Sequence, residues 1–564
     1  MVFGGKMEQV RSFALDHHGL VAGTCDDLGL IEKINQRIGS QDCRRVIQPG
    51  IAIKAMIING LGFTSRQLYL TPQFFSSKPV ERLLGAGITA EQLDDHTLGK
   101  ALDEIYSYGA TNFFGEIALE IAKEQGLLGN TGKLDSTSFL VHGDYARDED
   151  NIDTTAAVGK ESDTLKKAIA ITNGYSKAHR PDLKQVMLSM VVSGAASLPF
   201  WMQAQDGNSS DKATFQQSLR AASDLRKQLN TDDSFVWIAD SALYSKESIQ
   251  AIDHCTWITR VPESIKECKE AIEKERVLDD LLDFGDGYTG YLTTSDYGGI
   301  PQQWLVVHSV AALKRETETL ERQIIREQEH ALKACWHLKN MVFNCRCDAE
   351  KHLADFAKDF KHHNIQASIQ ELRQHAGQGR PKKRVLAGLV GYTIEAVPLL
   401  DTVKKARTLR RKGAFVLATN ELDKTQMQAE IILRNYKSQQ SVEQGFRFLK
   451  EPQFMADTLF LKSPERIEAL MVVMCLCLLI YNFAQHKLRA ALEVQKATLP
   501  NQKKKEIANP TLKWVFQLMK GVAIVEIYDK ASQQWQSMVT NLHPIRQKIL
   551  KLFGGATLKI YGIL

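Results

Sequence analysis

Residues 133–261 alternate between strand-like and helix-like segments, and this alternation limits the possible folds most strongly. Runs of β-branched and aromatic residues predict strands over 133–142, 168–172, 184–193, 198–203, 235–239 and 257–261. Helical signals fall between the later strands, over 214–229 and from Ser245 onward. Strands that alternate with helices are typical of an α/β domain, which is the fold class we predict.

Two aspartates lie on strands of this alternation. Asp135 lies near the start of the first strand, and Asp240 follows the strand 235–239 directly. Each acid alone has a simpler interpretation, as a turn cap or a surface charge, and Asp240 before Ser241 is a plausible helix cap. Their order along the chain favours the interpretation that both belong to one site.

A third acid lies on a predicted helix over residues 435–450, which contains no proline. With about 100° per residue, five residues fall within about 80° of one another, namely Tyr436, Gln439, Glu443, Arg447 and Lys450. A solvated stripe with helical ion pairs explains such a face equally well. The same face also suits phosphates held beside a metal ion.

Carboxylates are the ligands that fix Mg²⁺ in proteins, usually one or two per ion, with water and substrate phosphate completing the shell. Three acids on rigid elements can hold two ions about 3.5–4 Å apart, an arrangement that promotes in-line phosphoryl displacement. Asp135, Asp240 and Glu443 are therefore the candidate metal ligands.

The remaining segments predict further domains. Residues 1–128 are expected to form a helical domain, in which a pair of short helices is either a DNA-reading helix-turn-helix or a plain helical hairpin. The core is expected over 129–264 and 411–490, interrupted at 265–410 by an insertion with a β-hairpin and a long charged helix. A C-terminal helical region is expected over 491–564.

Composition is that of an ordinary globular protein, with 564 residues, 44% hydrophobic residues and a formal net charge of +5. Basic runs at 381–384, 404–412 and 503–505 suit a polyanion, although each is more often a solvated face. The nine scattered cysteines suggest a reducing compartment. Cysteines 335, 345 and 347 with His337 and His352 do not match a tight zinc pattern. No signal peptide is apparent, and the apolar run 469–481 is shorter than a membrane span, so we expect a cytoplasmic protein without membrane contact.

Taken together, these motifs resemble bacterial insertion-sequence transposases of the DDE type, whose signature is Y-x2-R-x3-E-x6-K on a helix after two strand aspartates. Here the signature corresponds to Tyr436, Gln439, Glu443 and Lys450, so that Gln439 departs from the family's arginine. The resemblance also covers the segments 133–138, 174–185, 206–211 and 238–242 and extends over nearly the whole chain. It implies a ribonuclease-H-like catalytic core.

By this resemblance, Asp135, Asp240 and Glu443 form the catalytic triad and bind two Mg²⁺ ions, with Mn²⁺ as a substitute. Tyr436 and Lys450 are expected to contact DNA phosphates. An amide lacks the cationic fork of arginine, so the clamping expected at Gln439 is weaker or passes to Arg447 or Arg434. The remaining candidate DNA contacts are Lys177, Arg180 and Trp304. Trp304 is a candidate for stacking on a flipped base, although packing is the commoner role of a hairpin tryptophan.

The implied function is a transposase that binds terminal inverted repeats, cleaves double-stranded DNA and joins the ends to target DNA by cut-and-paste. A homodimer is expected in the active complex, and the cytoplasmic protein is expected at the nucleoid when bound to DNA. The alternatives are a ribonuclease-H-like nuclease without strand transfer and a non-enzymatic DNA-binding protein derived from a transposase.

Overall fold

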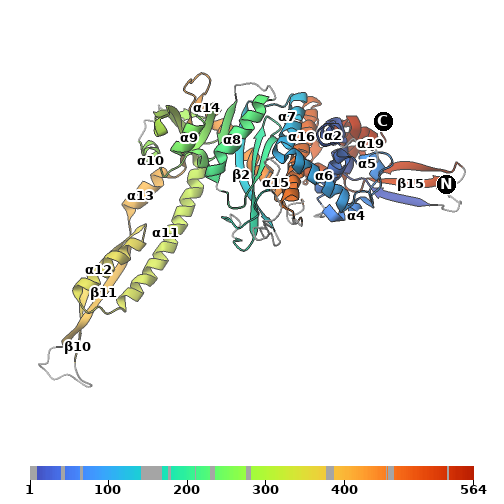
Figure 1. Cartoon of the computed structure of the whole chain (residues 1–564). Coiled ribbons are helices and arrows are strands. Elements are labelled where there is room, and N and C mark those ends of the chain that lie inside the picture. Colours follow the sequence, from blue (N-terminus) through green and yellow to red (C-terminus); the bar gives the residue numbers. More distant parts are fainter. Residues whose placement is uncertain are drawn as a thin grey trace, which may run out of the picture. The chain divides into compact units, whose positions relative to one another are not determined.

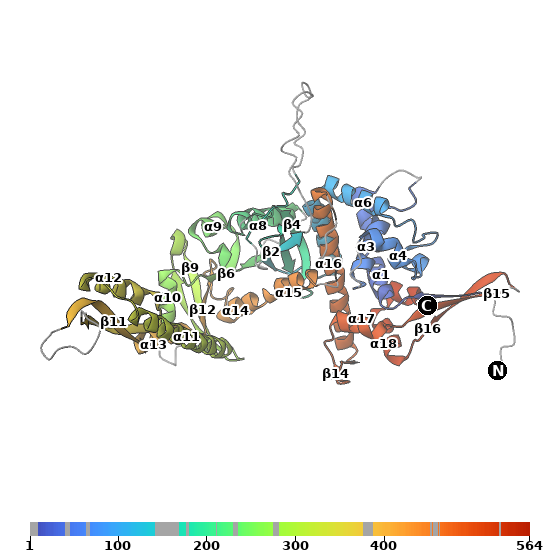
Figure 2. The ribbon, with the colours of Figure 1, turned by 90° about the horizontal axis from the view of Figure 1, so that it is seen from below.

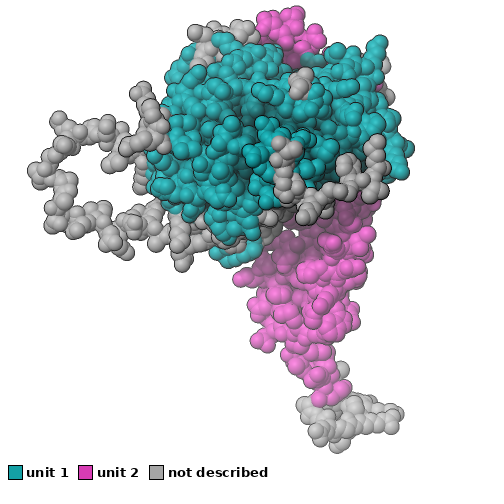
Figure 3. Space-filling view, turned by 90° about the vertical axis from the view of Figure 1, so that its right-hand side faces the viewer, with its two compact units in different colours: residues 1–259, 298–300, 434–564 teal, residues 260–297, 301–433 magenta. Residues whose placement is uncertain are grey.

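The computed structural model describes residues 9–39, 45–63, 68–141, 168–175, 180–209, 211–228, 235–274, 281–375, 387–451, 454, 461, 463–529 and 532–563. The chain divides into two compact units, coloured separately in Figure 3. Unit 1 comprises residues 1–259, 298–300 and 434–564, and unit 2 comprises residues 260–297 and 301–433. All three candidate carboxylates belong to unit 1, so their arrangement can be described within a single compact body.

A mixed sheet forms the centre of the part of unit 1 that carries the candidate carboxylates (Figure 1). The strands of unit 1 lie in this sheet in the order β4-β3-β2-β5-β6. Neighbours are antiparallel from β4 to β2, whereas β5 and β6 run parallel to β2. The strands are β2 (Thr131–Val141), β3 (Lys184–Ser193), β4 (Leu198–Gln205), β5 (Val236–Ala239) and β6 (Thr256–Val261). Five of the six predicted strands are confirmed. The predicted strand 168–172 is wrong, since only an isolated bridge from Thr172 to Gln185 forms there.

Helices cover both faces of this sheet. On one face, Ser218 of α8 (Asp211–Gln228) forms hydrogen bonds with Gln203 and Gln205 of β4. The opposite face presents Met190 of β3, directly across from Asp135 of β2. There α15 (Gln440–Leu449) approaches so closely that a Cβ added at Gly445 would lie 3.2 Å from Met190 Cε. The Asp135 face is therefore the one covered by α15.

The long helix α16 (Pro464–Val494) packs beside α15 and begins as the sequence predicts. Ser463 caps it by accepting a hydrogen bond from the Arg466 amide, and Pro464 occupies the first turn. This is the one helix among the described residues that is long and apolar enough to cross a membrane. However, 83% of its most apolar window is buried inside the protein, as in a core helix.

The N-terminal region is mostly helical, as predicted. Asp94 caps α6 by accepting a hydrogen bond from the Thr97 amide at 2.7 Å. The helices are α1 (His18–Asp27), α2 (Leu30–Ile38), α3 (Pro49–Gly60), α4 (Thr71–Phe75), α5 (Val80–Leu84), α6 (Asp95–Tyr108) and α7 (Ala110–Glu124).

Strands from both terminal regions form one three-stranded sheet, and its strands β15 and β16 lie where we expected a helical region over 491–564. β1 (Val10–Ala14) pairs with β15 (Ala523–Asp529), which pairs with β16 (Gln534–Thr540). The run AIVEIYD in β15 is rich in β-branched residues, and this local preference favours a strand over the expected helix. The other C-terminal elements are β13 (Leu499–Pro500), β14 (Glu506–Ile507), α17 (Leu512–Met519), α18 (Pro544–Phe553) and α19 (Gly555–Ile560).

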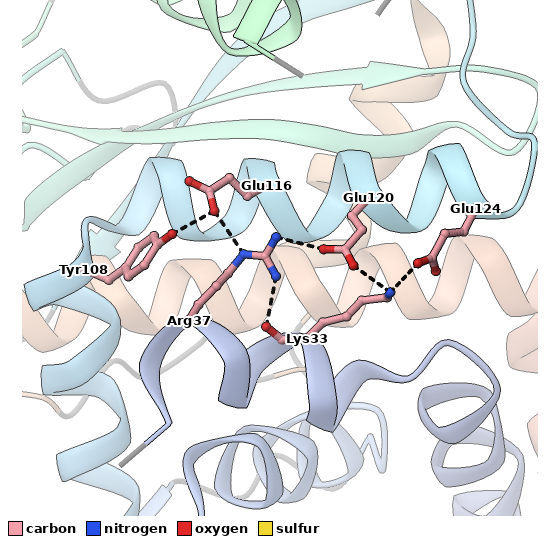
Figure 4. A network of polar contacts seen from close by, with 6 residues as sticks. All are labelled: Lys33, Arg37, Tyr108, Glu116, Glu120 and Glu124. Carbon is pink, nitrogen blue, oxygen red and sulfur yellow. Dashed lines mark hydrogen bonds and ion pairs between the residues drawn. The ribbon is translucent and has the colours of Figure 1, made fainter. Parts of the chain in front are cut away.

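A network of ion pairs joins α2 to α7 (Figure 4). Lys33 donates to Glu120 at 2.9 Å and to Glu124 at 2.7 Å, while Arg37 contacts Glu116 at 3.0 Å and Glu120 at 2.8 Å. Burial raises the pKa of Glu120, but hydrogen bonds from Lys33 and Arg37 outweigh burial and hold it below 4.5. Glu120 is thus the shared acceptor that connects both cations.

Replacing Glu120 by glutamine should lower the free energy of unfolding by about 1–2 kcal/mol near neutral pH, since two partly screened cations lose their shared anion. Because the folded-state pKa lies below 4.5, the stabilisation is present above that pH and is lost as the pH falls below it. The difference between Glu120→Gln and wild type should therefore shrink towards pH 3 in denaturant titrations. The exposed Glu32, replaced in the same way, is the matched control and should show little difference at any pH.

Unit 2 includes the residues over which we expected an insertion, except residues 298–300. β8 (Tyr288–Ser295) and β9 (Gln302–Ser309) form the expected hairpin, with β7 (Leu282–Asp283) beside β8 and β12 (Ala414–Thr419) beside β9. The predicted charged helix is α11 (Val310–Lys339), which packs against the hairpin of β10 (His363–Gln374) and β11 (Gly388–Leu400). The other helices described include α10 (Lys266–Glu273), α12 (Arg346–Phe356) and α13 (Thr402–Arg411).

Candidate active site

The register of two parallel strands brings the two aspartates together. Leu134 of β2 is the partner of Ala239 of β5, so the next residues, Asp135 and Asp240, occupy neighbouring positions. Residues in register on adjacent strands project from the same face of a sheet. Both carboxylates therefore belong to the α15-covered face. In open α/β sheets, ligands bind outside the carboxyl ends of parallel strands, which is where Asp240 lies.

Short hydrogen bonds hold both aspartates. Asp135 Oδ1 accepts from the Ser136 amide at 2.8 Å, and Asp240 Oδ1 accepts from the Ser241 amide at 2.6 Å. Asp135 is half-buried and Asp240 is exposed. Two residues before Asp135, burial lowers the pKa of Lys133. The site is thus reachable from solvent at Asp240 and more enclosed along β2.

Thr259 of β6 supports Asp240 from the neighbouring strand. Its buried hydroxyl donates to the Asp240 carbonyl at 2.9 Å. We expect Thr259→Val to cost about 1 kcal/mol of unfolding free energy, because the carbonyl loses its donor at nearly unchanged side-chain volume. Thr259→Ser retains the hydroxyl and is the control. Equal stability of the valine and serine variants in denaturant titrations would show that the hydrogen bond contributes nothing.

The helix that carries Glu443 is broken, in contrast to the continuous helix expected over 435–450. α14 (Ala429–Lys437) ends before Ser438, and α15 begins at Gln440. The Ser438 hydroxyl donates to the Asn435 carbonyl at 2.6 Å, and the Gln439 amide bonds to the Tyr436 carbonyl three residues back. Side chains of this kind compete with the helical hydrogen-bond ladder, which explains the break. Tyr436 and Glu443 are therefore on different helices.

α15 presents its polar face away from the core. Val442, Phe446 and Leu449 are buried, whereas Glu443, Arg447 and Lys450 are exposed.

Two contacts fix the course of α15 along β2. Gly445 lies over Met190, the cross-strand partner of Asp135, and Lys450 Nζ lies 5.5 Å from the Phe139 ring centre. Phe139 is four residues beyond Asp135 on the same face of β2. Glu443, two residues before Gly445, therefore lies towards the Asp135 end of the strand.

The structure brings the acids to one face without closing them into a ligand group. Among the described residues, no three His, Cys, Asp or Glu side chains lie close enough together to hold a metal ion. The donor chemistry nevertheless fits Mg²⁺, which takes only one or two carboxylates per ion and prefers oxygen ligands.

The other predicted DNA contacts differ in their exposure and in their bonding partners. Lys177 lies outside the described residues. Arg180 is exposed but forms an ion pair with Asp182 at 2.7 Å, and Tyr436 is half-buried. Gln439 is only 7% exposed, and Trp304 of unit 2 is 2% exposed with its indole donating to Gln302. Burial therefore does not support a phosphate contact at Gln439 or base stacking at Trp304. Trp304 is enclosed because β9 lies between β12 and β8.

Sequence patterns alone did not identify the residues that position α15. In the sequence, Met190 is one of many apolar residues in a predicted strand, and Gly445 is a single glycine in a predicted helix. Gly445 was the only sequence signal of a close contact, since a glycine inside a helix usually has a packing reason. Here the reason is the close approach of α15 to Met190 and Leu478.

Comparison with known families places this arrangement in a class. Residues 131–480 match the family described as "Transposase DDE domain", and residues 10–119 match a "Domain of unknown function (DUF4277)". The first match covers more than half of the chain, and the chain therefore belongs to the transposase DDE domain family. It is a transposase, as the sequence motifs predict.

Solved transposase structures show a weaker likeness. A piggyBac transposase synaptic complex with hairpin DNA matches over 91% of this chain and 83% of that chain, at 7% identity and a TM-score of 0.34. A Mos1 transposase paired-end complex with the left transposon end matches over 36% of this chain and 57% of that chain, at 13% identity and a TM-score of 0.15. Both scores are too low to support an argument about the fold. No curated protein matches the chain.

Proposed function

We propose that this transposase binds the terminal inverted repeats of a bacterial insertion sequence, cuts there and joins the released ends to target DNA. The observation that carries the proposal is the register of Asp135 and Asp240 on neighbouring parallel strands, beneath the helix that bears Glu443. The strand order β4-β3-β2-β5-β6, with three antiparallel strands followed by two parallel ones, supports a ribonuclease-H-like core. Family membership supports the activity.

In the proposed reaction, water first attacks a phosphorus atom at the transposon end. The bond from phosphorus to the 3′ oxygen breaks, which leaves a 3′ hydroxyl and a 5′ phosphate. The 3′ hydroxyl then attacks a target phosphodiester, so that one phosphorus–oxygen bond forms as another breaks and no external energy source is needed.

Asp135, Asp240 and Glu443 are the residues that would hold the Mg²⁺ ions, or Mn²⁺ in their place. When bound, such ions lower the pKa of the attacking group and stabilise the leaving oxygen. The exposed Arg447 on α15 and Lys450 at its C-terminal end supply positive charge and would hold the phosphates of the DNA strand being cut.

The proposal is tested with the full chain and DNA that carries the sequences flanking its own gene. With Mg²⁺ we expect cleavage at the ends and joining to a second DNA, and with EDTA we expect binding alone. Cleavage without joining would instead favour a nuclease, and binding without cleavage a non-enzymatic descendant. We further propose that the active complex is a homodimer across two ends, and that the protein is cytoplasmic and nucleoid-associated. Light scattering of the DNA complex tests the stoichiometry.

A further inference from the structure

A pocket lies in unit 1 between α15 and α16, two helices that Figure 2 shows beside the sheet. Its volume is about 430 Å³, which falls within the range of small-molecule sites. The turn between β3 and β4 and the residue before α17 complete the wall. The polar residues that matter here are Ser441, Gln444, Arg447, Asn482 and Arg489.

The charge of this pocket favours an anion. Arg447 and Arg489 both line it, whereas the acid in its lining, Glu451, forms an ion pair with Lys513. Arg489 donates from Nε to the Pro510 carbonyl and from Nη2 to the Asn509 carbonyl. A guanidinium has five N–H donors, so these two bonds leave donors for a ligand. The pocket therefore carries an excess of positive charge.

A hydroxyl in the pocket also lacks a partner. Ser441 Oγ is buried and has no hydrogen-bond partner among the described residues. Buried polar atoms are nearly always satisfied, so such an atom in a cavity wall indicates a bound group or ordered water. An oxyanion next to two arginines would satisfy it by accepting a hydrogen bond from the Ser441 hydroxyl.

The pocket adjoins the candidate active site. On α15, Arg447 is rotated by about 40° from Glu443 and Gln444 by about 100°. Arg447 thus borders both the exposed Glu443 face and the pocket. A DNA strand bound at the Glu443 face can therefore reach the pocket without crossing the β-sheet.

We infer that the pocket between α15 and α16 binds a phosphate group of the DNA strand held at the Glu443 face. The inference rests on the proposed function. The inference adds two residues to those proposed to hold DNA. Arg489 lies on α16, and Ser441 lies near the start of α15. Free nucleotides share this phosphate chemistry and provide the comparison in the experiment.

The test introduces a negative charge without changing the shape of the pocket. Gln444→Glu should weaken binding of a fluorescent DNA end about tenfold, since the new carboxylate repels the phosphate. Gln217→Glu makes the same change at an exposed position of α8, on the opposite face of the sheet. This control variant should bind the DNA end as tightly as wild type. Wild-type affinity of Gln444→Glu would overturn the inference.

A second pair of variants counts phosphate contacts. Arg489→Gln should reduce the slope of log affinity against log salt by about one, whereas Arg220→Gln should leave it unchanged. Arg220 is the matched control because it is exposed on α8 and also donates to a backbone carbonyl, that of Ala251. The thermal midpoint of each variant shows whether it is folded. An unchanged slope in folded Arg489→Gln would contradict the inference.

Free phosphates distinguish the source of the ligand. Binding of dAMP or inorganic phosphate that is lost in Gln444→Glu, with DNA binding intact, would assign the pocket to a free nucleotide and overturn a DNA contact. Failure of this inference can be distinguished from failure of the proposed function. If wild type cleaves DNA while Gln444→Glu binds normally, only the pocket assignment fails, and if wild type never cleaves, the catalytic proposal fails.

Discussion

Replacing Asp135 by asparagine should reduce Mg²⁺-dependent cleavage of DNA ends by about a thousandfold or more while leaving DNA binding nearly intact. Loss of a metal ligand removes several kcal/mol of transition-state stabilisation, and each 1.36 kcal/mol changes the rate tenfold. The amide oxygen of asparagine can still accept the Ser136 hydrogen bond, so the local fold should persist. Gel assays of cleavage, joining and binding measure all three quantities on one preparation.

The same loss is expected for Asp240→Asn and Glu443→Gln. Because the three acids would act as one unit, a double variant should be little worse than a single one. Asp224→Asn and Glu247→Gln change the same residue types at exposed positions on α8 and on α9 (Lys246–Ala251), and should cleave like wild type. Full activity in any one of the three candidate variants would remove that residue from the proposed triad.

The strands of unit 1 were predictable because buried strands carry a strong local signal. β3 is rich in β-branched and apolar residues, and the structure buries nine of its ten residues. The strand 168–172 carries the same local signal but has only one bridge, because strand formation depends on a partner that sequence patterns do not supply. The alternation also predicted that Asp135 and Asp240 belong to one site. The sequence could not show that their strands are neighbours in register, because strand pairing is set by the assembled sheet.

The helix with Glu443 shows where local patterns fail. A run without proline predicted one helix, but the Ser438 hydroxyl bond to Asn435 interrupts it, and Gln439 is buried at the break. The position where the resemblance implies an arginine therefore does not face solvent here. The strand β15 was missed although its β-branched run favours a strand and its partner β16 follows closely in the chain. Only its pairing with β1, more than 500 residues away, lies beyond any local window.

Gly445→Val should reduce cleavage about a hundredfold although it changes no carboxylate, since errors of about 1 Å in position can have that effect. An added Cβ would lie 3.0 Å from Leu478 Cδ2 and 3.2 Å from Met190 Cε, and valine adds two methyl groups beyond it. The helix must then move away from Met190 of β3 and Leu478 of α16, and this shift displaces Glu443 relative to Asp135. Overpacking of this kind should also cost about 1–3 kcal/mol of unfolding free energy.

Met190 provides the decisive comparison, because it is both the neighbour of Gly445 and the cross-strand partner of Asp135. Met190→Ala alone should destabilise the core without displacing α15 outward. Combined with Gly445→Val, it removes the contact with Met190 while that with Leu478 remains, and should restore part of the cleavage, at a stability below that of wild type. Recovery in the double variant would show that the spacing between α15 and the sheet controls the candidate carboxylates. If the double variant were as inactive as Gly445→Val, the contact with Met190 would not set the position of Glu443.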